Sequence, residues 1–351
     1  MKTKKGFFAL LLALLLCMGL SQPAFAGEGR YSDVPEDHWA AEGVERAAEL
    51  GLFSGVGDGL FGLGQPISRA AFATALVRLF GWETVVSGRA SFDDVAPDAW
   101  YYAAIETAYA NGAVAASGQD FRPDEDITRG EMAAMLVRGL GYTSLAGTAS
   151  GYDSPFTDVT ANKGFITLAY DIGIMGGVGD GLFNPDGTAT REMAAVMLVR
   201  AYDRLNTRSV RLAYAGNYGE ISVATPKADP ADQLPTTPLE PLTELYETLR
   251  ELKDSGTDMS HMALCLTAGG VRTVVADGEI ISSEVITARQ VSEILDMDGV
   301  RTYYSDPYQC AYCIYRPAAG QEATVWYQSN EGTAAKLQMA RLFGVTHYFV
   351  V

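Results

Sequence analysis

Residues 92–131 carry the pattern that decides the fold of the N-terminal half. They begin with Phe-Asp-Asp-Val at 92–95, continue through Trp100 and a turn at 118–121, and end with Thr-Arg-Gly-Glu at 128–131. The same landmarks recur on either side in the same order, with a period of roughly sixty residues. A period of this length predicts several copies of one small unit that stack on one another.

Three units share these landmarks. The Asp-Val pair begins at Asp33, Asp94 and Asp158, and the glycine-containing turn ends at Phe61, Phe121 and Phe183. A hydroxyl-Arg pair then opens an apolar run that ends in Val-Arg. The pairs are Ser68-Arg69, Thr128-Arg129 and Thr190-Arg191, and the closing arginines are Arg78, Arg138 and Arg200.

Each unit predicts two helices joined by a turn. Residues 39–52 place apolar side chains at helical spacing, and Gly51 is suited to end that helix. Ser68, Thr128 and Thr190 stand where the N-cap of the second helix belongs, since a side-chain oxygen there accepts a free amide proton. One such unit cannot bury both apolar faces alone, so the units must associate.

Residues 31–82, 90–142 and 155–205 resemble the S-layer homology family. The resemblance rests on aromatic-x-Asp-Val, the tryptophan, the glycine turn ending in Phe, and the Thr-Arg-Ala-Glu motif, for which this chain has Ser68-Arg69-Ala70-Ala71, Thr128-Arg129-Gly130-Glu131 and Thr190-Arg191-Glu192-Met193. It implies an all-α domain of three helix-loop-helix units around a pseudo-threefold axis. It also implies grooves between the units that bind a secondary cell-wall polymer, typically through a pyruvylated amino sugar.

The resemblance carries a set of candidate glycan-binding residues onto this chain. An arginine at a helix N-terminus can hold a carboxylate with two parallel hydrogen bonds, and a tryptophan can stack on a sugar ring. The candidates are Arg69, Arg129, Arg191, Ser68, Thr128, Thr190, Glu131, Trp39, Trp100, Asp33, Asp94 and Asp158.

Structural roles compete with binding at these positions. Trp39 and Trp100 are interpreted first as core anchors, with sugar stacking as the alternative. The three motif arginines bind a ligand or pair with the Asp-Val aspartates, and both roles can apply. The hydroxyl residues are most simply helix caps.

The three motifs are not equally complete. The motif glutamate survives only as Glu131, and counting six residues from Asp158 places Gly164 where the other units have tryptophan. The second unit is therefore predicted to be the best binder, and replacing Arg129 is predicted to weaken wall binding more than replacing Arg69 or Arg191.

The N-terminus predicts export. Lysines at 2, 4 and 5, an apolar run from 7 to 20 and Ala-Phe-Ala at 24–26 have the layout of a signal peptide. The run is shorter than the roughly 20 residues of a transmembrane helix. The whole chain has a formal charge of −17, and removing three lysines with residues 1–26 makes it −20. So acidic a chain argues against nucleic acid as a partner.

Residues after 207 predict a second module. Five prolines between 217 and 241 favour a linker or extended loop. Residues 242–351 alternate between helical and extended patterns, in an α+β or partial α/β order. Val-Trp-Tyr-Gln at 325–328, Lys-Leu-Gln-Met-Ala at 336–340 and Phe-Gly-Val at 343–345 resemble the end of a family-18 glycoside hydrolase (chitinase-like) barrel. The Asp-x-x-Asp-x-Asp-x-Glu motif of that family is absent from the sequence, so we predict no hydrolase activity.

No cofactor or metal is predicted. Cys310 and Cys313 are better interpreted as a disulfide or as two strand cysteines than as half of a zinc site, which needs about four ligands. The sequence thus predicts a secreted surface protein anchored non-covalently to the bacterial cell wall. The alternatives are a wall-anchored enzyme acting on glycans and a structural subunit that self-associates in a surface layer.

Overall fold

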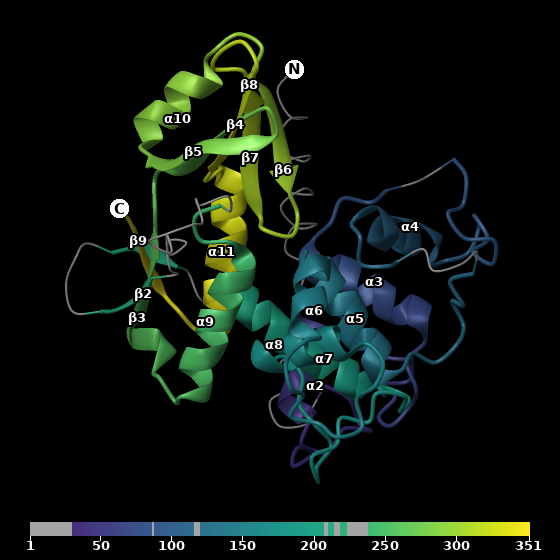
Figure 1. Cartoon of the computed structure of the whole chain (residues 1–351). Coiled ribbons are helices and arrows are strands. Elements are labelled where there is room, and N and C mark those ends of the chain that lie inside the picture. Colours follow the sequence, from purple (N-terminus) through teal and green to yellow (C-terminus); the bar gives the residue numbers. More distant parts are fainter. Residues whose placement is uncertain (1–29, 86–87, 116–119, 207–209, 214–217, 223–237) are drawn as a thin grey trace, which may run out of the picture.

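The computed structural model describes residues 30–85, 88–115, 120–206, 210–213, 218–222 and 238–351. The predicted signal peptide at 1–26 lies outside these residues. The chain forms a helical repeat lobe and a second lobe that carries the strands (Figure 1). No helix within the described ranges is both long and apolar enough to cross a membrane.

Each repeat contributes two helices. The first helices are α2 (Ala41–Glu49), α4 (Tyr102–Ala110) and α7 (Lys163–Asp171), and the second are α3 (Arg69–Phe80), α5 (Arg129–Gly139) and α8 (Arg191–Asn206). The predicted helix-loop-helix units are therefore confirmed. A short helix, α6 (Thr143–Ala149), connects the second and third repeats and was not predicted.

The repeats close into a ring. The second helix of each repeat packs on the first helix of the next, with α3 against α4, α5 against α7, and α8 back against α2. Apolar side chains from all three repeats, such as Val44, Ile105 and Ile166, belong to one continuous core. A single unit could not bury this surface, as the sequence indicates.

Three backbone hydrogen bonds mark the centre of the ring. The amide of Ile67 donates to the carbonyl of Ala189 at 3.1 Å, Ala189 donates to Ile127 at 2.9 Å, and Ile127 donates to Ile67 at 3.0 Å. Each residue gives one bond and accepts one, so the buried backbone groups satisfy one another in a cycle. This cycle has the pseudo-threefold symmetry that the resemblance to the S-layer homology family implies.

The second lobe begins with a parallel four-stranded sheet in the order β1-β9-β3-β2. Its strands are β1 (Arg211–Leu212), β2 (Gly219–Ser222), β3 (Met262–Leu266) and β9 (His347–Val350), accompanied by α9 (Leu242–Asp254), α11 (Asn330–Phe343) and a short 3-10 helix at Met259–His261. The prediction of a linker or extended loop at 217–241 is wrong at its start, which forms a strand, and the end of this segment is buried. β2 is part of the sheet, Leu239 and Glu240 are 3% and 4% exposed, and residues 223–237 lie outside the described residues.

An antiparallel five-stranded sheet is inserted between β3 and α11. Its order is β5-β4-β8-β7-β6, formed by β4 (Gly270–Ala276), β5 (Glu279–Ile286), β6 (Arg301–Ser305), β7 (Cys310–Tyr315) and β8 (Gln321–Tyr327). Helix α10 (Ala288–Leu295) packs on one face through Val291 and Ile294, where Val274, Cys313 and Val325 form a small core. The predicted α+β order of this module is confirmed.

Cys310 and Cys313 are two strand cysteines without a disulfide. They lie three residues apart on β7, so their side chains point to opposite faces of the sheet. Both thiols are free and buried, and burial raises their pKa values. The prediction of a disulfide between Cys310 and Cys313 is therefore wrong, and the alternative of two strand cysteines is confirmed.

The two lobes share a core and polar contacts. Tyr246 on α9 donates to Asp171 on α7 at 2.5 Å, and Nε of Arg250 lies 3.2 Å from the same carboxylate. On the other side of the interface, Gln338 on α11 donates to the hydroxyl of Tyr142 at 3.0 Å. The second lobe is therefore packed against the repeats rather than tethered to them.

Candidate functional site

The Asp-Val aspartates hold the turn of their own repeat. In the first repeat, both carboxylate oxygens of Asp33 accept backbone amides, from Phe61 at 2.7 Å and from Gly62 at 2.7 Å. The other repeats repeat this arrangement, with Asp94 bound by the amides of Phe121 and Arg122, and Asp158 by those of Phe183 and Asn184. Burial alone would raise the pKa of Asp33, but the turn amides lower it, so its charged form is favoured.

The motif arginines reach the turn of the next repeat. Nε of Arg69 donates to the carbonyl of Phe121 at 2.8 Å, that of Arg129 to Phe183 at 2.8 Å, and that of Arg191 to Phe61 at 3.0 Å. The guanidinium carbons lie 5.0, 4.7 and 5.1 Å from the centroids of the same phenylalanine rings, which are cation–π distances. The arginines thus connect neighbouring repeats.

One phenylalanine peptide per repeat is therefore held from both sides. Its amide is bound by the aspartate of its own repeat, and its carbonyl by the arginine of the preceding repeat around the ring. The predicted alternative of direct Arg–Asp pairs is replaced by this indirect link. Among the described residues, no motif arginine forms an ion pair with an Asp-Val aspartate, and Arg69 pairs with Glu131 instead.

The predicted caps are present in two of three repeats. Ser68 accepts from the amide of Ala71 at 3.3 Å, and Thr128 accepts from the amide of Glu131 at 3.2 Å in a complete capping box. The buried hydroxyl of Thr190 makes no hydrogen bond within the described part of the chain.

The outer nitrogens of the three arginines have different partners. Nη2 of Arg129 donates to the carbonyl of Gly176 at 2.8 Å, and Nη2 of Arg191 donates to that of Ser54 at 2.9 Å. Nη1 of Arg69 instead lies 2.6 Å from the carboxylate of Glu131. The motif glutamate of the second repeat therefore neutralises the arginine of the first.

Glu131 is charged because of its neighbours. Burial would raise its pKa, but the amide of Thr128 and the cations Arg69 and Arg122 lower it below the ordinary value of 4.5. In the other two repeats its position is taken by Met193 and Ala71. Arg129 and Arg191 therefore lack the acidic neighbour that Arg69 has.

A groove of about 290 Å³ opens beside Arg129. It is lined from three repeats, by Trp39 of the first, Arg129 of the second, and Met175, Met193, Val196 and Arg200 of the third. We call it the Arg129 groove.

A second groove, of about 150 Å³, opens beside Arg191 and is the counterpart of the first around the ring. Its lining includes Trp100 of the second repeat, Arg191 of the third, and Ser54, Ala71, Thr74 and Arg78 of the first. We call it the Arg191 groove. Both grooves are lined by an exposed tryptophan, a motif arginine and the arginine of a Val-Arg pair on the second helix.

The interpretation of the tryptophans as core anchors is wrong. Trp39 and Trp100 are 61% and 68% exposed. Each precedes the N-cap of its helix, at Ala40 and Tyr101, so the side chain is outside the helical pattern that fills the core. They are free to contact a ligand in the grooves.

The third interface, around Arg69, is built differently. Helices α2 and α4 begin eight residues after Asp33 and Asp94, whereas α7 begins five residues after Asp158. The position of the tryptophan is therefore Ala161, and the assignment of Gly164 to it is wrong. Gly164 lies within α7, where a Cβ atom would come within 1.7 Å of the carbonyl oxygen of Ala146.

The second arginine of this interface is also covered. The guanidinium of Arg138 lies 4.5 Å from the ring centroid of Phe165, which follows Gly164 on α7. The Arg69 interface thus combines an arginine paired with Glu131, an arginine against Phe165, and alanine in place of tryptophan. Sequence reasoning did not identify Arg78 and Arg200 as groove residues, although the recurrent Val-Arg pairs are the signal that marks them.

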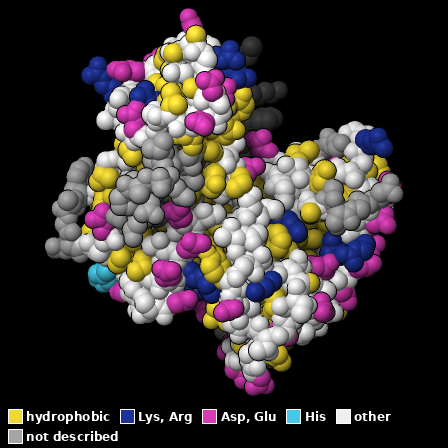
Figure 2. Space-filling view, in the orientation of Figure 1, with side chains coloured by type: hydrophobic (Ala, Val, Ile, Leu, Met, Phe, Trp, Pro, Cys, Tyr) yellow, Lys and Arg dark blue, Asp and Glu magenta, His cyan; other side chains and the backbone are white. Residues whose placement is uncertain are grey.

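On the face drawn in Figure 2, acidic and basic side chains are spread over both lobes. No group of three or more His, Cys, Asp or Glu side chains suited to a metal ion occurs among the described residues.

Comparisons with known proteins identify the three repeats. The family model described as the S-layer homology domain matches residues 30–73, 91–133 and 155–195. The chain is 28% identical to a cell surface protein of Thermoanaerobacter kivui over 58% of its own length and 25% of that protein. It is 26% identical to the S-layer protein sap of Bacillus anthracis over 56% of its length and 24% of that protein.

An amylopullulanase of Thermoanaerobacterium thermosulfurigenes is 30% identical over 50% of this chain and 10% of the enzyme. The chain thus spans between 10% and 25% of the length of these three relatives. Among solved structures, the spore cortex-lytic enzyme SleL of Bacillus megaterium is similar with a TM-score of 0.32 and 14% identity, over 38% of this chain and 30% of that chain. The repeat lobe of this chain consists of three S-layer homology repeats.

Proposed function

We propose that this chain is a secreted cell-surface protein that the repeat lobe holds non-covalently on the bacterial cell wall. The ligand is a secondary cell-wall polysaccharide with an acidic, pyruvylated amino sugar. The observation that carries the proposal is the pairing of an exposed tryptophan with two arginines in the Arg129 and Arg191 grooves. Relatives named as cell surface and S-layer proteins support the location.

The chemistry of the grooves suits an acidic sugar. The tryptophan offers an apolar face for the C–H side of a pyranose ring, while the guanidinium groups attract a carboxylate. Each motif arginine stands at a helix N-terminus, whose dipole adds to that attraction. Because the chain as a whole carries a formal charge of −17, capture of an anion depends on such local cation clusters.

We propose two binding grooves rather than three. At the Arg69 interface, Glu131 supplies the carboxylate that a ligand would otherwise supply, and Phe165 covers Arg138. The predicted ranking of Arg129 above Arg69 remains a prediction. Like Arg129, Arg191 lines a groove beside an exposed tryptophan, with Ala71 in place of Met193, so we expect both arginines to contribute.

For the second lobe we propose no hydrolase activity. The acidic motif on which the chitinase-like resemblance would depend is absent from the whole sequence. The amylopullulanase and an exoglucanase of Acetivibrio thermocellus among the relatives keep a wall-anchored enzyme as the second candidate. A surface-layer subunit is the third, supported by the relatives named as S-layer proteins.

Sedimentation with purified cell walls tests the anchor. We expect the full chain to sediment with walls and to stay in solution once the secondary polymer has been chemically removed. The Trp39→Ala/Trp100→Ala variant should lose sedimentation. Tyr218→Ala, which removes an exposed aromatic side chain of the second lobe that lines neither groove, is the control and should sediment like the unchanged chain.

Sedimentation that persists after removal of the polymer would contradict the proposal. Release of reducing sugar from walls or soluble glycans by the full chain would favour the enzyme. Ordered two-dimensional sheets of the purified chain would favour the surface-layer subunit.

A further inference from the structure

One face of the five-stranded sheet carries a row of aromatic side chains. The strand register places Tyr303 of β6 opposite Tyr312 of β7, and Tyr312 opposite Trp326 of β8. The ring centroids of the two tyrosines are 5.1 Å apart, and those of Tyr312 and Trp326 are 4.6 Å apart. Since Val325 and Cys313, on the alternate positions, pack beneath α10, this row lies on the face opposite that helix.

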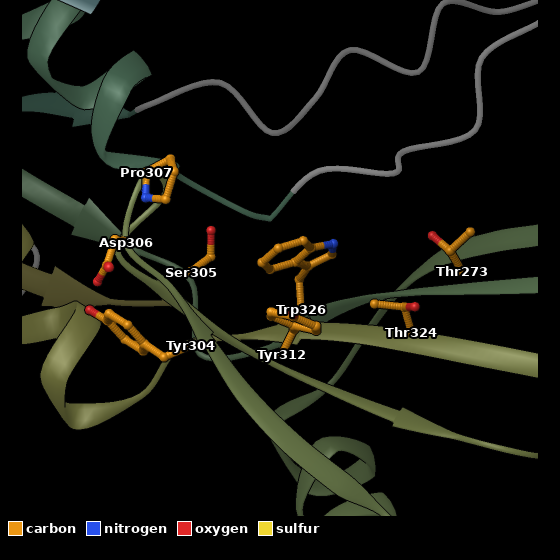
Figure 3. A pocket seen from close by; sticks show the side chains of 8 residues that line it. All are labelled: Thr273, Tyr304, Ser305, Asp306, Pro307, Tyr312, Thr324 and Trp326. Atoms are coloured by element: carbon orange, nitrogen blue, oxygen red, sulfur yellow. The ribbon is translucent and has the colours of Figure 1, made fainter. Parts of the chain in front are cut away.

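A hollow of about 650 Å³ lies over this row. In Figure 3, Trp326 lies in its middle, above Tyr312, with Thr273 and Thr324 on one side and the turn of Ser305, Asp306 and Pro307 on the other. Tyr308 meets the indole edge-on at 5.5 Å and so restricts its movement. Ligand sites commonly have volumes of about 300 to 1,000 Å³, aromatic walls and a few placed polar groups, and this hollow has all three.

The polar groups of the hollow are hydroxyls and one carboxylate. The register pairs Thr324 of β8 with Thr273 of β4, so their side chains lie side by side on the face that carries Trp326. Across the indole, Ser305 and Asp306 border the opposite side. A central indole with hydroxyl and carboxylate groups on both sides matches a pyranose ring, whose C–H groups contact the aromatic system and whose hydroxyls form hydrogen bonds at its edge.

The charge of the lining selects among ligands. Within the described part of the chain, the residues that line the hollow include Asp306 but no lysine, arginine or histidine. A phosphate or an acidic sugar would meet a carboxylate without a compensating cation, which disfavours it. Four of the eight described lining residues are threonine, serine or aspartate. A purely apolar ligand would leave their hydroxyl and carboxylate groups without hydrogen-bond partners. The chemistry is the reverse of that in the two grooves of the repeat lobe, which present arginines.

We propose that this hollow is a second saccharide site, which binds a neutral oligosaccharide of hexopyranose units on Trp326. Thr324 binds a sugar hydroxyl on one side, beside Thr273, whose hydroxyl lies 3.1 Å from that of Ser283, and Ser305 and Asp306 bind sugar hydroxyls on the other. The site does not depend on the grooves, because it lies in the other lobe and disfavours the anionic sugars that the grooves attract. The chain then contacts both an acidic and a neutral glycan.

Titration calorimetry on the full chain tests this site. The neutral probes are the tetrasaccharides of β-1,4-linked glucose and of β-1,4-linked N-acetylglucosamine, and the acidic probe is the methyl glycoside of a pyruvylated amino sugar. We expect at least one neutral probe to bind, and Trp326→Ala to weaken it at least tenfold. Trp39→Ala, the matched control, should leave neutral binding unchanged.

Two further variants keep the test independent of folding. Thr324→Val preserves side-chain shape on β8 and Asp306→Asn preserves the turn, and each should weaken the neutral probe severalfold with an unchanged melting temperature. Failure of both neutral probes to bind at millimolar concentration would overturn the inference, as would binding that all three variants leave intact. Neither result would affect binding of the acidic probe, which is governed by the grooves.

Discussion

The Arg129 groove and the Arg69 interface are built from equivalent residues and have different chemistry. In both, a motif arginine binds the phenylalanine carbonyl of the next repeat at 2.8 Å. In the Arg129 groove, Met193 and the exposed Trp39 line the groove together with the arginine. In the other, Glu131 pairs with the arginine and alanine replaces the tryptophan. A ring of near-identical units can therefore keep one contact for assembly and vary the surroundings for binding.

The largest expected effect comes from removing both groove tryptophans. Trp39→Ala/Trp100→Ala should lower affinity for purified walls about a hundredfold, because two linked sites are weakened together and avidity is lost. The side chains are largely exposed, so the melting temperature should stay within about 2 °C. Wall sedimentation and thermal unfolding measure the two quantities. A loss of binding accompanied by a clearly lower melting temperature would show that the tryptophans have a structural role.

The next largest effect is expected from a substitution that gives the Arg129 groove the acidic residue found at the Arg69 interface. Met193→Glu places a carboxylate beside Arg129, at the position that Glu131 occupies beside Arg69. We expect affinity for the acidic probe in that groove to fall about tenfold, since the added charge competes for the arginine. Met193→Gln is the matched control and should retain most of the affinity. Equal effects of the two variants would show that size rather than charge matters there.

Glu131→Gln should affect stability rather than binding. Its carboxylate pairs with Arg69, whose side chain is 10% exposed, so its loss should cost about 2 kcal/mol at pH 7 while wall affinity changes little. The folded pKa of Glu131 is lowered, so its contribution is complete above the ordinary value of 4.5 and is lost as the pH falls through the lower folded value. Denaturant unfolding from pH 7 to pH 3 should show the gap between the two chains closing. A gap that is constant with pH would exclude the ion pair as its source.

The smallest effect is expected from restoring a tryptophan to the third repeat. Ala161 is exposed and takes the position of Trp39 and Trp100, so Ala161→Trp should be tolerated. Because Arg69 remains paired with Glu131, affinity for walls should change less than about twofold. Competition binding with the unchanged chain is the suitable measurement. A clear gain in affinity would mean that the third interface lacks only its aromatic group.

Much of the repeat lobe could be predicted from the sequence because its signals are local. The helices follow from apolar spacing, and the turns from glycines such as Gly57 and Gly59, whose φ angles of 111° and 72° other residues rarely adopt. Continuously apolar strands such as β7, whose sequence is Cys-Ala-Tyr-Cys-Ile-Tyr, were also predictable. β5 was not, since seven of its eight residues are not buried, and β1 has only two residues.

The candidate site was harder to predict because it depends on contacts between repeats. Trp39 seemed to belong to an apolar run, but it precedes the helix, so helical spacing does not govern its exposure. The partner of Arg69 is in another repeat, and no pattern within one unit indicates that Glu131 crosses to it. Counting from Asp158 failed because the third repeat has a shorter loop before α7, which only the helix positions reveal.

The number of acidic sugars bound per chain tests the account most directly. Titration calorimetry of the full chain with the methyl glycoside of a pyruvylated amino sugar should give two sites. Trp39→Ala and Trp100→Ala should each remove one of them. Three sites, or two that survive the replacement of both tryptophans, would contradict the assignment of binding to the Arg129 and Arg191 grooves.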